Sequence, residues 1–259
     1  MGLIKRIRRK MGEAFRDYPL IDDGDRILVA VSGGKDSLSL LHLLRENALH
    51  APVHYTLIPI HVDLGTCRSR VGALTDYFRR TGEEYRIVEA DAGRVVCGAG
   101  DLPESCCFHC SRIRRNLIFR TARDLGIRKI AFGHHADDLM ETCLLNMFYA
   151  GNISTMLPRQ ELFNGEVVLI RPLAYCREEW LRDYARLHAL PVQEEVCDEG
   201  GVHSRRRRIK ELLLELESET PGVKGNLLRS LQNVRASYLP RPMTQPSGTA
   251  EKEGTRSGG

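Results

Sequence analysis

The stretch from Val31 to Ser37 reads VSGGKDS and directly follows an apolar run at positions 27–30. Ligands of an open α/β sheet bind beyond the carboxyl ends of its strands, and glycines there let backbone N–H groups approach a phosphate. Lys35 would add positive charge, and Asp36 is suited to hold magnesium. The stretch is not a Walker A loop, since a carboxylate follows its lysine. It predicts a phosphate site, and the alternative is a plain turn with Asp36 at a helix start.

A second group of polar residues lies in FGHHADDLMET, positions 132–142, after another apolar run. It places two imidazoles and two carboxylates at the edge of the sheet that carries the glycine-rich stretch. These are His134, His135, Asp137 and Asp138. One aspartate would suffice to cap a helix, but the four together favour metal and nucleotide chemistry.

The third group is the cysteines of ESCCFHC, positions 104–110. Cys107 and Cys110 form a C-x-x-C immediately before a predicted helix, where thiolates are favoured and can serve metal, cluster or redox chemistry. A four-cysteine zinc site would need a second C-x-x-C, which the sequence lacks. A cluster held by three thiolates needs one more ligand, and Cys197 is the leading candidate. The alternatives are Cys67, Cys97, Cys143 (expected in the core), Cys176 and the adjacent Cys106, unless all of these are incidental buried thiols.

Arginines form the fourth group. Arg112, Arg114 and Arg115 follow the C-x-x-C, and Arg205, Arg206, Arg207 and Arg208 open a predicted C-terminal helix. Cations at a helix N-terminus oppose the macrodipole, so four in a row need a reason. One explanation is that the arginines form a solvent-exposed face partly paired with Glu211. The more specific explanation is that they bind the phosphate backbone of an RNA. Further basic residues near the N-terminus would extend the rim, namely Lys5, Arg6, Arg8, Arg9 and Lys10.

Alternating apolar runs and helical patterns must position these groups. Strands are expected at 26–31, 55–62, 84–90, 128–133 and 167–173, and helices at 36–47, 75–80, 111–126, 136–150 and 177–190. This alternation predicts an α/β fold, a doubly wound and mostly parallel sheet. Only helices are expected later, at 204–217 and 226–234. The expected units are a basic lead-in at 1–25, the α/β domain at 26–189, a helical extension at 190–239 and a disordered tail at 240–259.

Composition narrows the class of protein. The chain has 259 residues, of which 42% are hydrophobic and 28% charged, as in a globular protein. No apolar run is long enough to span a bilayer, and the basic N-terminus lacks the apolar core of a secretory signal. We therefore expect a cytoplasmic protein without a membrane partner. Its eight cysteines are then better explained as ligands, catalysts or core residues than as disulfides. A net charge of +4 does not by itself establish a nucleic-acid partner.

These residues carry a resemblance to a known family. SGGKDS resembles the pyrophosphate-binding loop of the N-type ATP pyrophosphatases, the PP-loop superfamily. CFHCSRIRRNLIFRTA, GHHADDLMETCLLNMFYAG and IRPLAYCREE are similar to the tRNA 2-thiocytidine synthetases within it. The resemblance covers about residues 20–240. It implies the adenine nucleotide alpha hydrolase-like fold and a two-step reaction. ATP adenylates the C2 oxygen of an anticodon-loop cytidine, cytidine 32, and releases pyrophosphate. Sulfur delivered through a [4Fe–4S] cluster then displaces AMP.

The resemblance also implies roles for individual residues. The nucleotide site would include Ser32, Gly33, Gly34, Lys35, Asp36, Ser37, His61, Gly133, His134, Asp137 and Asp138. Asp36 and Asp138 would bind Mg²⁺, while Cys107, Cys110 and Cys197 would hold the cluster and act with Asp36 in catalysis. The family usually draws its third cluster ligand from a later C-x-x-C-G pattern. Here that region reads Cys197-Asp198-Glu199-Gly200-Gly201, with a glycine in place of the later cysteine.

The expected partners are tRNA and a cysteine desulfurase or other sulfur donor, and a homodimer is left open. Other functions compete. One is another PP-loop reaction, such as lysidine synthesis or ATP-dependent amidation. The C-x-x-C argues against lysidine synthesis, and the absence of a glutaminase domain argues against an amidotransferase. A non-catalytic, redox-sensing protein that binds nucleotide and RNA is the alternative from another class.

Overall fold

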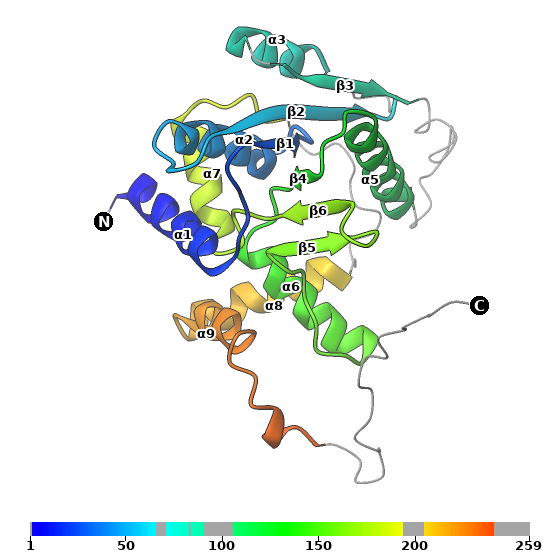
Figure 1. Ribbon diagram of the computed structural model, residues 1–259. Coiled ribbons are helices and arrows are strands. Elements are labelled where there is room, and N and C mark those ends of the chain that lie inside the picture. The colour runs from blue at the N-terminus through cyan, green and yellow to red at the C-terminus, as the bar shows by residue number, and fades with distance from the viewer. Residues whose placement is uncertain (1, 66–70, 83, 91–105, 194–204, 241–259) are drawn as a thin grey trace, which may run out of the picture.

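The computed structural model describes residues 2–65, 71–82, 84–90, 106–193 and 205–240 around one six-stranded sheet (Figure 1). The strand order is β3-β2-β1-β4-β6-β5. Five strands are parallel: β1 Asp25–Ala30, β2 Tyr55–Asp63, β3 Arg86–Glu89, β4 Lys129–Ala131 and β6 Val167–Ile170. The edge strand β5, Arg159–Leu162, pairs antiparallel with β6. The prediction of a doubly wound, mostly parallel sheet is confirmed.

Alternate residues of the central strand face two different cores. Ile27 and Val29 of β1 belong to one apolar cluster, and Leu28 and Ala30 belong to the other. Successive side chains of a strand point to opposite faces, so a strand covered on both faces reads as a continuous apolar run. This explains why the strands could be recognised from apolar runs without polar alternation.

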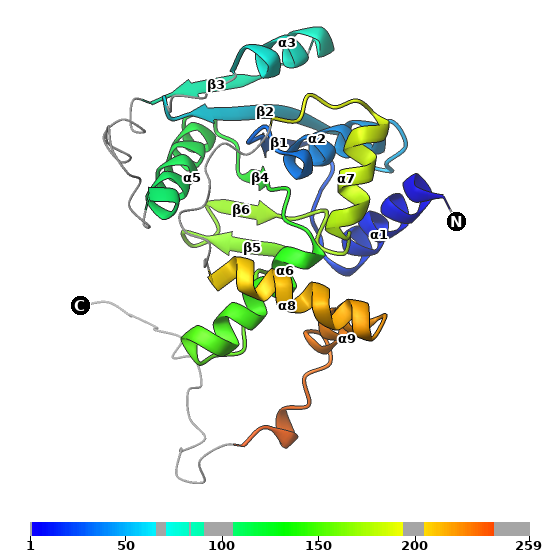
Figure 2. The ribbon, with the colours of Figure 1, turned by 180° about the vertical axis from the view of Figure 1, so that it is seen from behind.

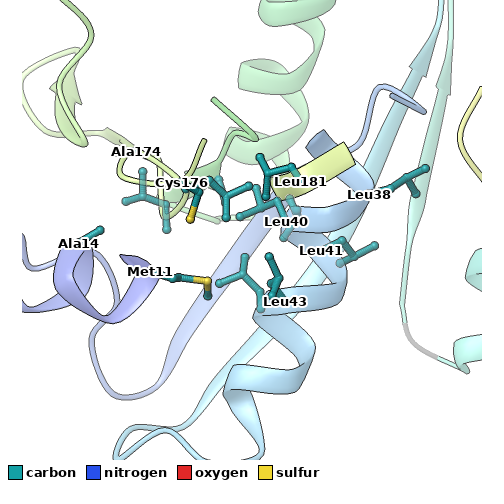
Figure 3. Packing of buried hydrophobic residues seen from close by; sticks show 14 of the residues in the cluster. Met11, Ala14, Leu38, Leu40, Leu41, Leu43, Ala174, Cys176 and Leu181 are labelled. Carbon is teal, nitrogen blue, oxygen red and sulfur yellow. The ribbon is translucent and has the colours of Figure 1, made fainter. Parts of the chain in front are cut away.

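The helices that contribute buried residues to the first core are α1 Leu3–Asp17, α2 Lys35–Ala48, α3 Val71–Thr81, α7 Glu178–Leu187 and, through Leu139, α6 Ala136–Leu145. Figure 3 shows Met11 of α1 extending toward Leu40 and Leu43 of α2, and Ala14 of α1 belongs to the same cluster. The segment expected as a basic lead-in therefore also supplies core residues. Helix α5, Cys106–Asp124, covers the opposite face of the sheet through buried Ile118 and Ala122.

The C-terminal helices pack beside β5 and not on either face of the sheet (Figures 1 and 2). Helix α6, Ala136–Leu145, meets α8, Arg205–Glu219, in a third small apolar core, and α9, Val223–Ser230, contacts both. The buried members of this core are Ala136, Met140, Leu144, Ile209 and Leu213. Docking of the extension therefore places charged residues of α8 close to the start of α6.

Several boundaries differ from the sequence-based expectation. The α-helix expected over 136–150 ends at Leu145 and continues as a π-helix, η1 Asn146–Ala150. Strand β5 was not predicted, because RQEL carries little apolar signal at an exposed edge. Helix α5 begins at Cys106, so the C-x-x-C lies within its first turns and not before it. The last expected helix is displaced to Val223–Ser230, and a short 3₁₀ helix, η2 Ala236–Tyr238, follows. Within the described ranges, no helix combines the length and apolarity needed to cross a membrane.

Gly133 allows the end of β4 to approach the start of α2 closely. A Cβ atom at this position would lie 2.9 Å from the carbonyl carbon of Asp36 and 2.9 Å from the backbone nitrogen of Ser37. Both atoms belong to backbone, which cannot rotate away as a flexible side chain would. The absence of a side chain at Gly133 therefore keeps the glycine-rich loop against the sheet.

We predict that Gly133→Ala lowers the free energy of unfolding by about 1–3 kcal/mol, because the added methyl overpacks a backbone contact. Urea denaturation measures the change. Gly12→Ala is the matched control: Gly12 lies within α1 and its Cβ would meet no atom within 4 Å. That control should raise stability by up to about 1 kcal/mol, as glycine is a poor helix former. Equal effects of the two variants would contradict the close-approach argument.

Candidate functional site

A pocket of about 300 Å³ opens at the carboxyl ends of β1, β2 and β4. The glycine-rich loop, the first turn of α6 and one side of α5 complete its walls. Its lining residues are Ala30, Val31, Ser32, Asp36, Ser37, Ile60, Val62, Ser111, Arg114, Arg115, Ile118, Phe132, Gly133, His134 and Asp138. The polar groups that the sequence pointed to on separate segments thus meet in one place. Positive and negative side chains both face the cavity.

Hydrogen bonds within the glycine-rich loop fix its shape. The Ser37 hydroxyl lies 3.0 Å from the Gly34 carbonyl, to which it donates, and 3.1 Å from the backbone N–H of Ser32. Gly33 has a φ of +94°, a conformation that favours glycine. The Gly33 carbonyl accepts a hydrogen bond from the backbone of Gln193 at 2.9 Å. Ser32, Asp36 and Ser37 line the pocket, whereas Gly33, Gly34 and Lys35 shape the loop behind it.

Asp36 presents one engaged and one spare carboxylate oxygen. Its Oδ2 lies 3.0 Å from Lys35 Nζ and 3.7 Å from His135 Nε2. Its buried Oδ1 has no hydrogen-bond partner among the described residues. Burial would raise the pKa of Asp36, but the hydrogen bond to His135 and the charge of Lys35 outweigh it, and the pKa is lowered. An ionised carboxylate with a spare oxygen at a phosphate loop suits a magnesium ion that arrives with its nucleotide.

Glu178, at the start of α7, connects the loop to the C-terminal extension. Lys35 Nζ lies 3.0 Å from its carboxylate, and Lys210 Nζ of α8 lies 2.8 Å away on the other side. Burial would raise the pKa of Glu178, but the hydrogen bonds from Lys210 and Lys35 outweigh it and lower that pKa to about 2. Glu178 is therefore an anion between two cations. The sequence analysis missed it, because nothing in the REEW stretch distinguishes it from a surface carboxylate.

The two aspartates of α6 have different surroundings. Asp137 is buried and outside the pocket lining: Lys224 Nζ contacts one oxygen at 2.9 Å, and the backbone N–H of Glu178 donates to the other at 2.8 Å. Asp138 lines the pocket, where Arg206 contacts Oδ1 at 2.5 Å and the backbone N–H of His135 donates to Oδ2 at 2.9 Å. Of the two, only Asp138 lies at the predicted nucleotide site.

The three predicted histidines also differ. His135 caps α6 by accepting from the backbone of Asp138, and although burial would lower the pKa of His135, the nearby carboxylates of Asp36 and Asp138 raise it. His61 lies behind the loop, where its Nδ1 is 2.8 Å from the Val31 carbonyl, and it does not line the pocket. His134 stacks on Phe132, with ring centroids 5.6 Å apart, and faces the cavity.

His134 is a neutral imidazole with a fixed tautomer. Burial, with the charge of Arg171 among the smaller causes, lowers the pKa of His134 to about 4. Arg171, itself buried, donates from Nε to His134 Nδ1 at 3.3 Å. Because Nδ1 accepts that bond, the ring proton resides on Nε2. Sequence analysis did not single out Arg171, which follows β6 and so reads as the end of an apolar run.

The structure describes part of the predicted cysteine site. Cys110 is buried in the first turns of α5, and its neighbour Ser111 lines the pocket. Cys107 belongs to the same helix one turn earlier, but its side chain lies outside the described residues, as do Cys106 and Cys197. No group of three or more His, Cys, Asp or Glu side chains gathers as a metal site in the described part of the chain.

The remaining cysteine alternatives divide in the same way. Cys67 and Cys97 lie outside the described residues. Cys143 and Cys176 are fully buried, and burial raises the pKa of both thiols, to about 12 for Cys176. Thiols held neutral in this way are poor ligands for a cluster. The expectation that Cys143 is a core residue is confirmed.

The predicted arginines fall into three groups. Arg114 and Arg115 line the pocket, and Arg112 is exposed one turn away. Arg206 points inward and bridges Asp138 and Glu141, at 2.5 and 2.8 Å, so its guanidinium is engaged within the protein. Arg205, Arg207 and Arg208 are exposed, with Arg207 3.2 Å from Glu211. Of the four consecutive arginines, Arg206 therefore forms ion pairs within the protein, and the other three are exposed to solvent.

Comparison with known proteins gives consistent results. The PP-loop domain family matches residues 3–216. A tRNA-cytidine(32) 2-sulfurtransferase from Geobacter sulfurreducens is 42% identical over 236 residues, covering 91% of this chain and 92% of that protein. One from Ralstonia pickettii is 41% identical, covering 90% and 74%. Among solved structures, the U34-tRNA thiolase NcsA from Methanococcus maripaludis with its [4Fe-4S] cluster superposes with a TM-score of 0.70 at 24% identity, covering 89% of this chain and 78% of that one. That likeness shows a shared fold.

We predict that Glu178→Gln lowers the free energy of unfolding by about 2 kcal/mol at pH 7, because it removes the anion between two cations. A carboxylate whose pKa is lowered by folding stabilises the protein above its unfolded pKa, and this contribution is lost as the pH falls toward about 2. The difference from the unsubstituted protein should therefore persist down to about pH 5 and narrow below it. Urea denaturation at several pH values measures this.

Glu179→Gln is the matched control. The Glu179 side chain is 59% exposed, and its ion pair with Arg177 is long, at 3.7 Å. This substitution should change stability by less than about 0.5 kcal/mol. A pH-independent loss in Glu178→Gln would show that the carboxylate does not stabilise the fold through its charge.

Proposed function

The chain belongs to the PP-loop family and, within it, to the tRNA-cytidine(32) 2-sulfurtransferases, and from this membership we propose how its residues carry out ATP-dependent thiolation of tRNA. The observation that carries the assignment is 42% identity over 92% of a curated relative, together with a pocket built around SGGKDS. In the proposed reaction, the C2 oxygen of cytidine 32 attacks the α-phosphate of ATP and pyrophosphate leaves. Sulfur then replaces the adenylated oxygen, and AMP leaves.

The glycine-rich loop would hold the pyrophosphate portion of ATP. Its backbone and the Ser32 and Ser37 hydroxyls offer hydrogen bonds at the N-terminus of α2, where the helix dipole favours an anion. Asp36 would hold Mg²⁺ through its spare Oδ1, and the ion would offset charge that develops on the leaving pyrophosphate. Lys35, held between Asp36 and Glu178, keeps positive charge beside the loop without entering the pocket.

Neutral and cationic donors would face the reacting cytidine from the opposite wall. Arg114 and Arg115 line the pocket and would provide positive charge for the phosphate that the oxygen attacks. His134 offers an Nε2–H donor that stays neutral at physiological pH, so it can hydrogen-bond a base oxygen without adding a cation. Asp138 could also help to bind Mg²⁺, but Arg206 already contacts one of its oxygens, so its negative charge would be shared between the ion and the guanidinium.

We propose that Cys107, Cys110 and Cys197 would hold a [4Fe–4S] cluster. The donor chemistry fits: Cys107 and Cys110 lie three residues apart at the start of α5, so they share a helix face near the pocket, and the helix N-terminus favours thiolates. When bound, the cluster supplies an iron at which sulfur can be held. Cys197 is proposed as the third ligand because it lies after the sheet, in the region from which the family supplies that ligand.

The tRNA would approach over exposed cations near the pocket, among them Arg112, Arg205 and Arg208. We further propose a cysteine desulfurase or another sulfur donor as a partner, and a cytoplasmic location where tRNA is available. The proposal is compatible with a homodimer. Residues 26–189 would form the catalytic domain, and 190–239 would form an extension that completes its charge balance. The salt bridges of Lys210, Lys224 and Arg206 support that role for the extension.

The function is tested in cells that lack this protein and carry variants on a plasmid. Nucleoside analysis of their tRNA by mass spectrometry should show 2-thiocytidine with the unsubstituted chain. We predict that Asp36→Asn lowers it about 100-fold or more, because the magnesium ligand and its charge are lost. Asp23→Asn, a control whose side chain is 71% exposed, should restore it fully. Full 2-thiocytidine with Asp36→Asn would refute the role of Asp36, and none with any chain would refute the function.

The cluster is tested by anaerobic reconstitution with iron and sulfide, followed by iron analysis and visible spectra. We predict that Cys110→Ser and Cys197→Ser lose more than half of the bound iron, since each removes one of three thiolate ligands. Cys143→Ser is the control and should retain the iron. Zinc binding without any iron–sulfur spectrum in the unsubstituted protein would refute the cluster itself.

A further inference from the structure

Five large apolar side chains are exposed within eleven residues after α6. They lie on the π-helix η1 and the loop that follows it, and we call them the η1 surface: Met147, Phe148, Tyr149, Ile153 and Leu157, with exposures of 41%, 56%, 47%, 57% and 55%. Single exposed apolar residues are ordinary, but five within one short segment are typical of a binding surface. Segments of π-helix are rare and occur often at functional sites.

The backbone beneath the η1 surface is firmly held. Asn146 Nδ2 donates to the Ser154 carbonyl at 2.9 Å, and the Thr155 hydroxyl donates to the Leu139 carbonyl of α6 at 2.6 Å. Arg171 donates to the carbonyl of Leu157. A frayed segment would expose apolar residues by losing such bonds. Here the bonds are made and the side chains still point outward, so the surface is preorganised.

The η1 surface is linked to the pocket by hydrogen bonds and by a helix. Arg171 joins the two, because it donates both to the Leu157 carbonyl and to Nδ1 of His134, which lines the cavity. Helix α6 connects them a second time: it carries Asp138 at the pocket and leads into η1 beyond the sheet (Figure 1). A chain whose reacting group sits in the pocket would therefore have its adjoining units over η1.

The charge next to the η1 surface is positive. The guanidinium of Arg205 lies 4.8 Å from the ring centroid of Tyr149, and Arg208 of the same helix is also exposed. A second copy of this chain seated here would have to bury Arg205 against apolar side chains, which is costly for an unpaired charge. An anionic polymer with flat apolar groups matches both the rings and the cation.

We propose that the η1 surface is a stacking platform for unpaired bases of the anticodon loop that flank the cytidine held in the pocket. The proposal rests on the proposed function and specifies how its RNA is recognised. Proteins that recognise single-stranded RNA by sequence splay its bases out and stack them on aromatic rings. Arginine guanidinium groups add cation–π contacts. Phe148 and Tyr149 supply the rings, and Met147, Ile153 and Leu157 the apolar margin.

The test is the affinity of the protein for a 17-nucleotide anticodon stem-loop RNA, measured by fluorescence anisotropy over a salt series. Phe148→Ala and Tyr149→Ala should each weaken binding about 5- to 140-fold, as stacking on one ring is worth about 1–3 kcal/mol per base. The slope of log affinity against log salt should stay unchanged in both. Arg205→Ala should make that slope less steep, by the amount expected when one phosphate contact is lost. Leu49→Ala, 78% exposed elsewhere, is the control and should bind as the unsubstituted protein does.

The Phe148 and Tyr149 variants should bind a fully paired RNA duplex with the same affinity as the unsubstituted protein, because a duplex has no unpaired base to stack. Unchanged affinity of both variants for the stem-loop would overturn the platform. So would a dimer of the unsubstituted chain in sedimentation equilibrium that Phe148→Asp turns into a monomer without loss of RNA affinity per chain. Formation of 2-thiocytidine by the unsubstituted protein separates these outcomes from a failure of the proposed function.

Discussion

Two carboxylates, the partly buried Glu178 and the buried Asp137, lie between the glycine-rich loop and the C-terminal helices, and their neutralisation constrains the rest of the site. A buried anion without a partner costs several kcal/mol, so each must meet cations with good geometry. Lys35 contributes from the loop, while Lys210 and Lys224 contribute from α8 and α9. The backbone of Glu178 also donates to Asp137, which locks the start of α7 onto the start of α6. The helical extension therefore takes part in the charge balance beside the pocket and is not an appendage.

Much of the fold could be predicted because strands covered on both faces are apolar throughout. The runs containing Ile27–Ala30 and Ile58–Ile60 needed no further signal. Edge strand β5 escaped because it is half exposed and only four residues long. The switch from α- to π-helix at Asn146 could not be seen either, since a π-helix of five residues is too short to show a period of its own. These errors arose where burial, and hence pattern, is weakest.

The candidate site divides in a similar way. Groups at strand ends, such as Asp36 and His134, could be predicted to meet because parallel strands end at a common edge. Arg171 and Glu178 could not, because their importance comes from partners that are distant in sequence. The run at Arg205–Arg208 shows the limit most clearly: sequence treats four arginines alike, whereas helical geometry turns Arg206 inward and leaves Arg205 outside. The spacing of residues along the sequence does not reveal which side chains contact one another in the folded protein.

The distribution of these charges along the chain has a consequence for synthesis on the ribosome. Lys35 and Asp36 emerge early, whereas Lys210 and Lys224 emerge near the end of translation. Domains generally fold as they are made, beginning from the N-terminus. An unfinished chain can thus form most of its sheet while Glu178 and Asp137 still lack their C-terminal cations. Incomplete or prematurely terminated products would leave Asp137 without Lys224, and Glu178 with Lys35 but not Lys210.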